Sequence, residues 1–352
     1  MSLTCSVRSF TVYGRVAAAA FQRCAEAAAY VNDRAPESYA VAVCLELPRE
    51  FAERCAAWSS TGQLQALHGG TASTPAAASD APAALDVVVE QYSSGGDAHV
   101  PSPRLLSATD FLALVAADTG YTAAAAAAAA VGGPADAQDA DDYYAELGQR
   151  AWRDFIAARG SQYCWMDVSI AAAPVGRVWF ELLTSVAPLT CKNFCELCRG
   201  TTVLVQGDAA AADDDALDTA AEAREQRIGY AGTTFFRTLK DAWVMAGDVS
   251  AGHTGNGGYS CFGRCFPEET FAVRHDAAGI LGMCNDGPHT NSSAFYITRR
   301  PMSWMDRKFV AFGRVMDGMD VVDAIHAVEV RHNQSPLETI TITDCGVFDP
   351  SS

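Results

Sequence analysis

The stretch FFRTLKDAWVMAGD, residues 235–248, opens the part of the chain that decides the fold. It is followed by GNGGYSCFG at 255–263, GILGMCNDGPHTNSSAFYIT at 279–298 and WMDRKFVAFGRV at 304–315. Each block combines a short apolar run with glycine or proline, a pattern that predicts short strands joined by tight, shaped loops. Upstream, WMDVSIAAAPVGRVWFELL at 165–183 predicts a hairpin, and APLTCKNFCELC at 187–198 predicts a helix.

In order and spacing, these blocks resemble the cyclophilins, the peptidyl-prolyl cis-trans isomerases built on a closed antiparallel β-barrel. The resemblance runs from Tyr163 to Pro350, about half of the chain. It implies that residues 161–352 form a cyclophilin-like closed eight-stranded barrel capped by helices. The family has a short loop where this chain carries an acidic, alanine-rich insertion at about 204–227. We expect that insertion to be a solvated loop, because long surface insertions cost little closure entropy.

The reaction of this family sets what its site must contain. Rotation about a peptide bond is opposed by roughly 18–20 kcal/mol, although the cis and trans states of an X–Pro bond lie close in energy. An enzyme for this step needs an apolar pocket for the proline ring and a fixed donor for the prolyl nitrogen. It needs no cofactor and no metal, and none is predicted.

The resemblance assigns roles to several positions of this sequence. It implies that Arg237 is the catalytic arginine, whose planar and always charged guanidinium lysine could not replace. Asn285 matches the asparagine that holds the substrate backbone. The other matches line the cleft, its floor and its rim: Gly255 in the cleft, Tyr296 in place of the floor phenylalanine, and Trp304 and Met305 on the rim.

Other positions depart from the family pattern. The glutamine that orients the arginine is replaced by Met245, and a second cleft glutamine by Ala294. Losing two such hydrogen bonds, at about 0.5–1.5 kcal/mol each, would slow the reaction by roughly one to two orders of magnitude. The sequence therefore predicts prolyl isomerase activity that is reduced or absent.

The pocket wall departs as well. The family's phenylalanine and methionine become Ala242 and Trp243, and its histidine near the pocket becomes Phe309. Asp286 replaces an alanine that contacts substrate, and one hypothesis is that it pairs with Arg237 and holds it away from substrate. Cys284 also lies within the predicted substrate site. A thiol–imidazole pair with His289 is one interpretation of this position, but the family has a plain alanine there, which argues against a nucleophile.

The first half of the chain, residues 1–120, predicts strands alternating with helices. Strands are expected at 9–13, 39–47 and 85–91, and helices at 17–30, 49–58 and after Ser107, an N-cap followed by Asp110. This order is similar to that of a thioredoxin-like α/β domain. The redox C-x-x-C motif is missing, because the first strand is followed by Gly14-Arg15-Val16-Ala17. Residues 121–142 predict an alanine-rich acidic linker, and 143–160 a connector helix.

Composition limits the partners. The formal net charge of -17 disfavours nucleic acid, and no apolar run approaches the ~20 residues of a membrane span. Twelve cysteines without a secretory signal favour free thiols. Cys191, Cys195 and Cys198 share one helix face with zinc-like spacing, but a fourth ligand is not evident. We interpret these three, and the pair Cys261 and Cys265, as core thiols.

The whole pattern is most similar to the peptidyl-prolyl isomerase-like type six group, divergent cyclophilins associated with motile cilia. This resemblance implies a cytoplasmic protein-binding or structural component of a ciliary or flagellar axoneme, contacting X-Pro segments, tubulin or other axonemal proteins. The alternative is an active cytosolic isomerase that assists folding. A basic, serine-containing N-terminus leaves mitochondrial targeting as a less favoured expectation.

Overall fold

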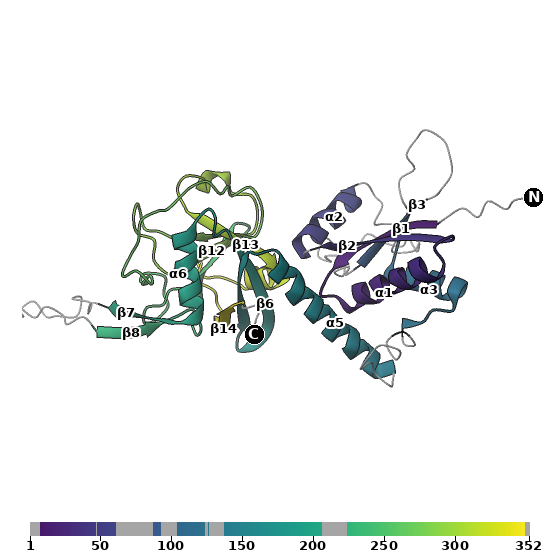
Figure 1. Cartoon of the computed structure of the whole chain (residues 1–352). Coiled ribbons are helices and arrows are strands. Elements are labelled where there is room, and N and C mark those ends of the chain that lie inside the picture. The colour runs from purple at the N-terminus through teal and green to yellow at the C-terminus, as the bar shows by residue number, and fades with distance from the viewer. Residues whose placement is uncertain are drawn as a thin grey trace, which may run out of the picture. The chain divides into compact units, whose positions relative to one another are not determined.

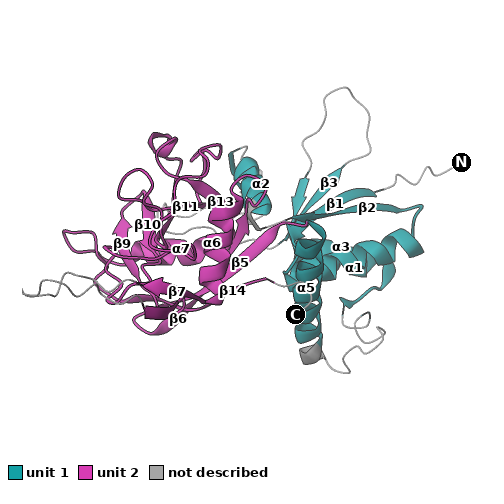
Figure 2. Ribbon diagram, turned by 60° about the vertical axis from the view of Figure 1, so that its left-hand side comes forward, with its two compact units in different colours: residues 1–159 teal, residues 160–352 magenta. Residues whose placement is uncertain are grey.

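The structure, a computed structural model, describes residues 8–46, 48–60, 87–92, 104–123, 126, 137–205 and 224–348 (Figure 1). The chain divides into two compact units, residues 1–159 and residues 160–352, which are coloured separately in Figure 2. Each unit has a hydrophobic core of its own. None of the helices in the described ranges is long and apolar enough to cross a bilayer.

Unit 1 contains a four-stranded sheet with the order β2-β1-β3-β4. β1 pairs in parallel with β2 and antiparallel with β3, which in turn pairs antiparallel with β4. The strands are β1 (Arg8–Arg15), β2 (Tyr39–Glu46), β3 (Val87–Tyr92) and β4 (Arg104–Leu106). The helices are α1 (Ala19–Arg34), α2 (Pro48–Ser60), α3 (Ala108–Thr119) and α5 (Ala137–Ala158). Each predicted element overlaps an observed one, although residues 47, 85 and 86 of the predicted strands lie outside the described residues. The short strand β4 was not predicted.

Two helices of unit 1 show how the local sequence sets their limits. Ser107 is the N-cap of α3, as predicted, and its hydroxyl accepts the backbone N–H of Asp110 at 3.1 Å. The connector helix α5 begins at Ala137, so the acidic residues 137–142 are helical and their assignment to the linker was wrong. Residues 127–136 of that linker lie outside the described residues. Within unit 1, α5 packs against α1, where the Tyr144 hydroxyl bonds the Glu26 carboxylate.

Unit 2 is an eight-stranded antiparallel sheet with the order β14-β5-β6-β13-β11-β12-β10-β9. Its strands are β5 (Gln162–Ile170), β6 (Ala173–Leu182), β9 (Phe235–Leu239), β10 (Trp243–Ala246), β11 (Ile280–Met283), β12 (Phe295–Thr298), β13 (Ala311–Asp317) and β14 (Ile340–Val347). The two ends of the sheet meet at a single bridge between Thr234 and Thr341. The expected barrel is therefore present and nearly closed.

The barrel core is centred on an aromatic side chain of helix α6 (Pro188–Arg199). Phe194 is fully buried, and its ring lies 5.2–5.8 Å from the rings of Phe180, Tyr230, Phe295 and Phe312. Such aromatic contacts add to the roughly 1.5–3 kcal/mol gained by burying a phenylalanine. Besides α6, the barrel carries α7 (Met319–Ala327) and the short 3-10 helix η3 (Ser303–Met305).

The acidic insertion is not wholly a loop. Its two ends form an antiparallel ribbon of β7 (Thr201–Val205) and β8 (Arg224–Ile228), which Figure 1 shows as a separate pair of strands. The expectation of a solvated loop across 204–227 was therefore wrong for the residues in these strands. Residues 206–223 lie outside the described residues.

The interpretation of the cysteines as core thiols is confirmed for the three in helix α6 and wrong for the pair at 261 and 265. Cys191, Cys195 and Cys198 are all buried in the barrel core, as predicted. Cys265 is exposed and Cys261 only half-buried, so that pair does not consist of core thiols. Over the described ranges, no group of three or more His, Cys, Asp or Glu side chains is arranged to hold a metal ion.

Candidate functional site

The predicted site residues gather around one row of side chains that crosses four strands. Arg237 on β9 pairs with Met245 on β10, Met245 pairs with Tyr296 on β12, and Tyr296 pairs with Gly282 on β11. Side chains alternate between the two faces of a strand, so Val244 and Ala246 point into the barrel core while Met245 faces outward. The row is therefore set by strand register.

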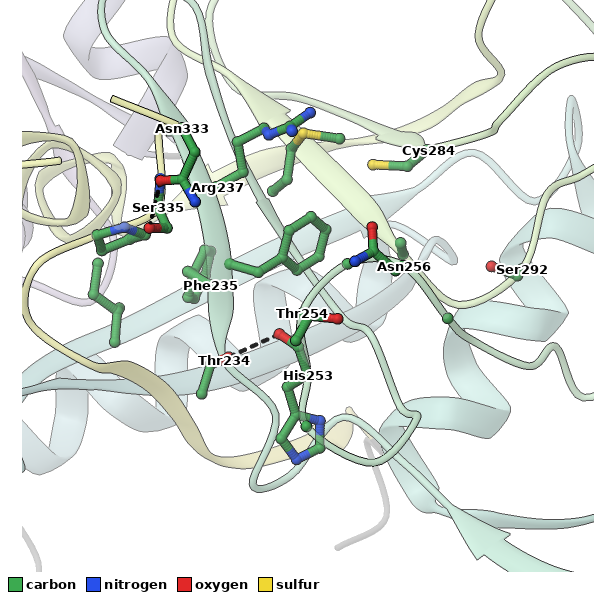
Figure 3. Close-up of a pocket in the computed structure, with 18 of the residues that line it drawn as sticks. Thr234, Phe235, Arg237, His253, Thr254, Asn256, Cys284, Ser292, Asn333 and Ser335 are labelled. Atoms are coloured by element: carbon green, nitrogen blue, oxygen red, sulfur yellow. Dashed lines mark hydrogen bonds between the residues drawn. The ribbon is translucent and has the colours of Figure 1, made fainter. Parts of the chain in front are cut away.

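An open cleft of about 730 Å³ lies along the Arg237 end of this row. Figure 3 shows Asn333 and Ser335 on one side of this cavity and Cys284 and Ser292 on the other. The predicted site residues that line it are Arg237, Met245, Gly255, Cys284, Asn285, Asp286 and Ala294. These residues are far apart in sequence and are brought together by the barrel.

The other predicted residues form an apolar cluster next to the cleft. Cys284 and Ala294 belong to both groups, so the cleft and the cluster adjoin. At the exposed edge the rings of Trp243 and Trp304 lie 5.6 Å apart, and Trp304 is 50% exposed. The predicted members of this apolar cluster and its edge are Ala242, Trp243, Tyr296, Trp304, Met305 and Phe309.

Arg237 faces the cleft without a partner to orient it. Its side chain is exposed, and within the described part of the chain its guanidinium makes no hydrogen bond or ion pair. Its cross-strand neighbour Met245 offers only a thioether, a weak acceptor. No ion pair joins it to Asp286, so the hypothesis that Asp286 holds Arg237 away from substrate was wrong for this structure.

A buried carboxylate shapes the wall of the cleft that carries Gly255. Asp248 is fully buried and accepts the backbone N–H of Gly255 at 2.7 Å and that of Ser250 at 3.0 Å. Gly255 has φ +85°, and a Cβ there would lie 2.4 Å from the ring of Phe236. Only glycine fits this position, because both the backbone conformation and the aromatic ring exclude a side chain.

The loop on the opposite side holds the remaining polar residues. The Asn285 side chain donates to the carbonyl oxygen of Lys308 at 3.1 Å. The His289 imidazole pairs with Glu268 at 2.9 Å instead of Cys284. Burial, and next the Asp286 charge, raises the pKa of the Cys284 thiol. The thiol is therefore protonated, and the structure gives no support for a thiol–imidazole nucleophile.

Two sets of residues at the site were not predicted from the sequence. The segment 333–340 contributes Asn333, Ser335 and Glu338 to the cleft, and it is attached to β9 by the Thr238 N–H, which donates to the Gln334 carbonyl oxygen at 2.9 Å. Such a contact between a loop and a distant strand leaves no signal in the sequence. The second set consists of His275 and Asp306, which hold the Tyr296 hydroxyl.

The Tyr296 hydroxyl lies 2.6 Å from Nε2 of His275, which is fully buried in a loop. On the other side of the imidazole, Nδ1 lies 2.9 Å from Oδ1 of Asp306. The backbone and side chain of His275 hold the pKa of Asp306 below its usual value, and burial raises the pKa of Tyr296. The sequence indicates only that a buried tyrosine needs a partner, not which residue supplies it.

An eight-stranded antiparallel barrel with an open cleft beside an apolar, aromatic-edged cluster is the architecture of the cyclophilin class. The model of the family described as cyclophilin type peptidyl-prolyl cis-trans isomerase/CLD matches residues 165–347, which is more than half of the chain. The chain therefore belongs to the cyclophilin family.

Individual relatives match over the same part of the chain. The protein named probable inactive peptidyl-prolyl cis-trans isomerase-like 6 is 34% identical in Homo sapiens over 206 residues, 58% of each chain. Its Bos taurus counterpart is 35% identical over 54% of this chain and 56% of its own length. Peptidyl-prolyl cis-trans isomerase B of Saccharomyces cerevisiae is 37% identical over 54% of this chain and 82% of its own. The chain spans little more than half the length of the first two relatives.

Proposed function

We propose that this chain is a divergent cyclophilin that binds X-Pro segments of proteins with weak or no isomerase activity, as a structural component of a ciliary or flagellar axoneme. The observation that carries the first part is the state of Arg237. It lies in the cleft, but its neighbour Met245 cannot orient the guanidinium. The relatives whose names include "probable inactive" support the same conclusion.

Binding needs less from the site than catalysis does. A proline ring and its flanking backbone can be held by apolar surface and by Asn285, whatever the orientation of Arg237. Isomerisation also requires a donor fixed at the prolyl nitrogen in the transition state, because only interactions that strengthen there accelerate the reaction. The retained cleft and the unsupported arginine therefore favour a binding protein.

The place of action is the second part of the proposal. It rests on the similarity to isomerase-like 6 proteins and places the chain in the cytoplasm, bound to tubulin or other axonemal proteins. Because tubulin is itself acidic and this chain carries a net charge of -17, such a contact relies on apolar anchors and shape. Unit 1 serves as a docking unit; its sheet order β2-β1-β3-β4 and lack of C-x-x-C support a thioredoxin-like fold without redox activity.

Turnover is tested in a protease-coupled assay with an Ala-Pro peptide. The full chain is expected to turn over at least about ten-fold more slowly than an ordinary cyclophilin, the effect of one to two lost hydrogen bonds. Arg237→Ala, at an exposed side chain, removes any residual rate without changing the unfolding midpoint. Turnover equal to that of an ordinary cyclophilin would refute the loss of activity.

One observation favours the alternative, an active isomerase. Arg237 is exposed and unpaired within the described residues, so it is free to meet a substrate. If a substrate orients the guanidinium by itself, turnover will be fast and will disappear in Arg237→Ala. The same assay therefore separates the two functions.

The axonemal role needs a separate experiment. A tagged full chain is expressed in a ciliated cell, and axonemes are stripped with detergent and washed with increasing salt. A structural component stays with the doublets through the salt wash, because apolar anchors are not screened by salt. Complete release into the detergent fraction would contradict this role and leave the binding function untouched.

A further inference from the structure

A hydrogen-bonded chain behind the cleft connects the floor of the apolar cluster to its rim. Its centre is His275, which is 0% exposed, and its ends are Tyr296 and Asp306. None of these three residues lines the open cleft. This hydrogen-bonded chain of three residues is therefore distinct from the cleft residues described above.

His275 is fixed from several directions. Asp306 Oδ1 accepts both the backbone N–H of His275 at 2.8 Å and its Nδ1–H at 2.9 Å. The carbonyl oxygen of His275 accepts the backbone N–H of Met302 at 2.6 Å. Because the carboxylate can only accept, Nδ1 carries a proton, and in the neutral imidazole Nε2 accepts the Tyr296 O–H. One imidazole therefore holds both the tyrosine and the segment 302–306.

The tyrosine hydroxyl has a place only because residue 282 is glycine. Gly282 lies opposite Tyr296 on β11, and a Cβ there would be 2.1 Å from the hydroxyl oxygen and 2.3 Å from Cζ. The hydroxyl thus lies against Gly282 and His275. The ring of Tyr296 is left to pack with Phe309, its centroid 5.9 Å away.

The other end of the chain is the rim. Asp306 directly follows η3, which carries Trp304 and the buried Met305. The N–H of Asp306 donates to the Ser303 carbonyl oxygen at 3.2 Å, so the residue that holds His275 also closes this short helix. The position of Trp304 is therefore tied, through Asp306 and His275, to the position of the Tyr296 ring.

We propose that His275 is a positioning residue that makes the Tyr296 floor and the Trp304 rim one rigid unit, pre-shaped for a proline-containing segment. This inference rests on the proposed binding function. It adds the hydrogen bonds that set the shape of the apolar cluster beside the cleft. Preorganisation raises affinity because the side chains are ordered before the ligand arrives. Loosening the unit should therefore weaken binding even though no ligand contact is removed.

The first test compares two buried tyrosines that each lose one hydroxyl. Tyr296→Phe breaks the bond to His275, whereas Tyr230→Phe breaks a bond to the Ser293 carbonyl oxygen, 2.8 Å long, elsewhere in the barrel. In the full chain labelled with ¹⁵N-tryptophan, the Trp304 indole signal is assigned by its loss in Trp304→Phe. Affinity for an Ala-Pro tetrapeptide is measured by titration.

Tyr296→Phe is expected to move the Trp304 indole signal and to weaken peptide binding about two- to ten-fold, the size of one hydrogen bond. Tyr230→Phe should lower the unfolding midpoint similarly and change neither readout. If Tyr296→Phe leaves both the indole signal and the affinity unchanged, the hydrogen bonds of His275 have only a structural role and the proposal is overturned.

A second test uses Asp306, at the other end of the hydrogen-bonded chain. Asp306→Asn keeps an oxygen that can accept both bonds from His275 and should retain the Trp304 signal, whereas Asp306→Ala should move it as Tyr296→Phe does. Equal signals in the two variants would contradict the proposal. If the unmodified chain binds no peptide, the binding function fails, but the indole signals still decide whether His275 couples floor and rim.

Discussion

The two ends of the residue row at the site differ in how firmly they are held. At the Tyr296 end, the side chain is 1% exposed and its hydroxyl is bonded to His275. At the Arg237 end, the side chain is exposed and, among the residues described, nothing holds the guanidinium. Packing and a hydrogen bond thus hold the Tyr296 end, whereas the residue across the strand from Arg237 is Met245, whose thioether is a weak acceptor. A barrel can therefore hold one end of such a row firmly and leave the other end without support.

The largest expected effect is at the Tyr296 end of the row. Gly282→Ala places a methyl group against the Tyr296 hydroxyl and should destabilise the barrel by about 1–3 kcal/mol, the usual cost of overpacking. Urea unfolding measures the loss. In the Tyr296→Phe background the ring is no longer tied to His275 and can shift, so the same substitution should cost less. Equal losses in both backgrounds would show that the hydroxyl does not fix the ring.

A smaller effect is expected at the Arg237 end of the row. Met245→Gln places an amide oxygen beside Arg237 across β9 and β10, where it can accept a guanidinium N–H. One such bond, about 0.5–1.5 kcal/mol, should raise the isomerase rate by up to about ten-fold. Met245→Leu, which adds no acceptor, is the matched control. A rate that stays the same in both variants would mean that the orientation of Arg237 does not limit turnover.

The smallest effect is a pH dependence at Asp306. Hydrogen bonds from the His275 backbone and side chain lower the folded-state pKa of Asp306 below its unfolded value of about 3.9. Its contribution to stability is therefore complete above that value and is lost as pH falls through the folded-state pKa. The difference in unfolding midpoint between the unmodified chain and Asp306→Asn should be constant near neutral pH and narrow below about pH 4. A difference that widens in acid would contradict this assignment.

The sequence predicted most elements of the barrel, and the residues that it assigned to the site lie around one cleft and the apolar cluster beside it. Short apolar runs with glycine and proline marked the strands. Because all four residues of β10 are apolar, only the structure separates Val244, in the barrel core, from Met245 on the other face. Local chemistry likewise placed the N-cap at Ser107. The start of α5 was missed because acidic, alanine-rich residues suit both a linker and a helix.

The partners of the site residues could not be predicted in the same way. His275 and Tyr296 are 21 positions apart, and the loop that carries His275 has no periodic pattern to orient it. An ion pair of Asp286 with Arg237 was one hypothesis from the sequence, yet the two side chains form none. The exposure of Cys265 was missed because a cysteine's burial depends on what packs against it.

The sequence by itself determined the family, the strands of the barrel and the apolar residue Met245 at the site, because these follow from residue identity and local order. Only the tertiary structure decided that Arg237 stands unsupported and that Tyr296 is held through His275 to the rim. Hydrogen bonds and close contacts between distant segments depend on distances of a few tenths of an ångström, and only the folded barrel sets these.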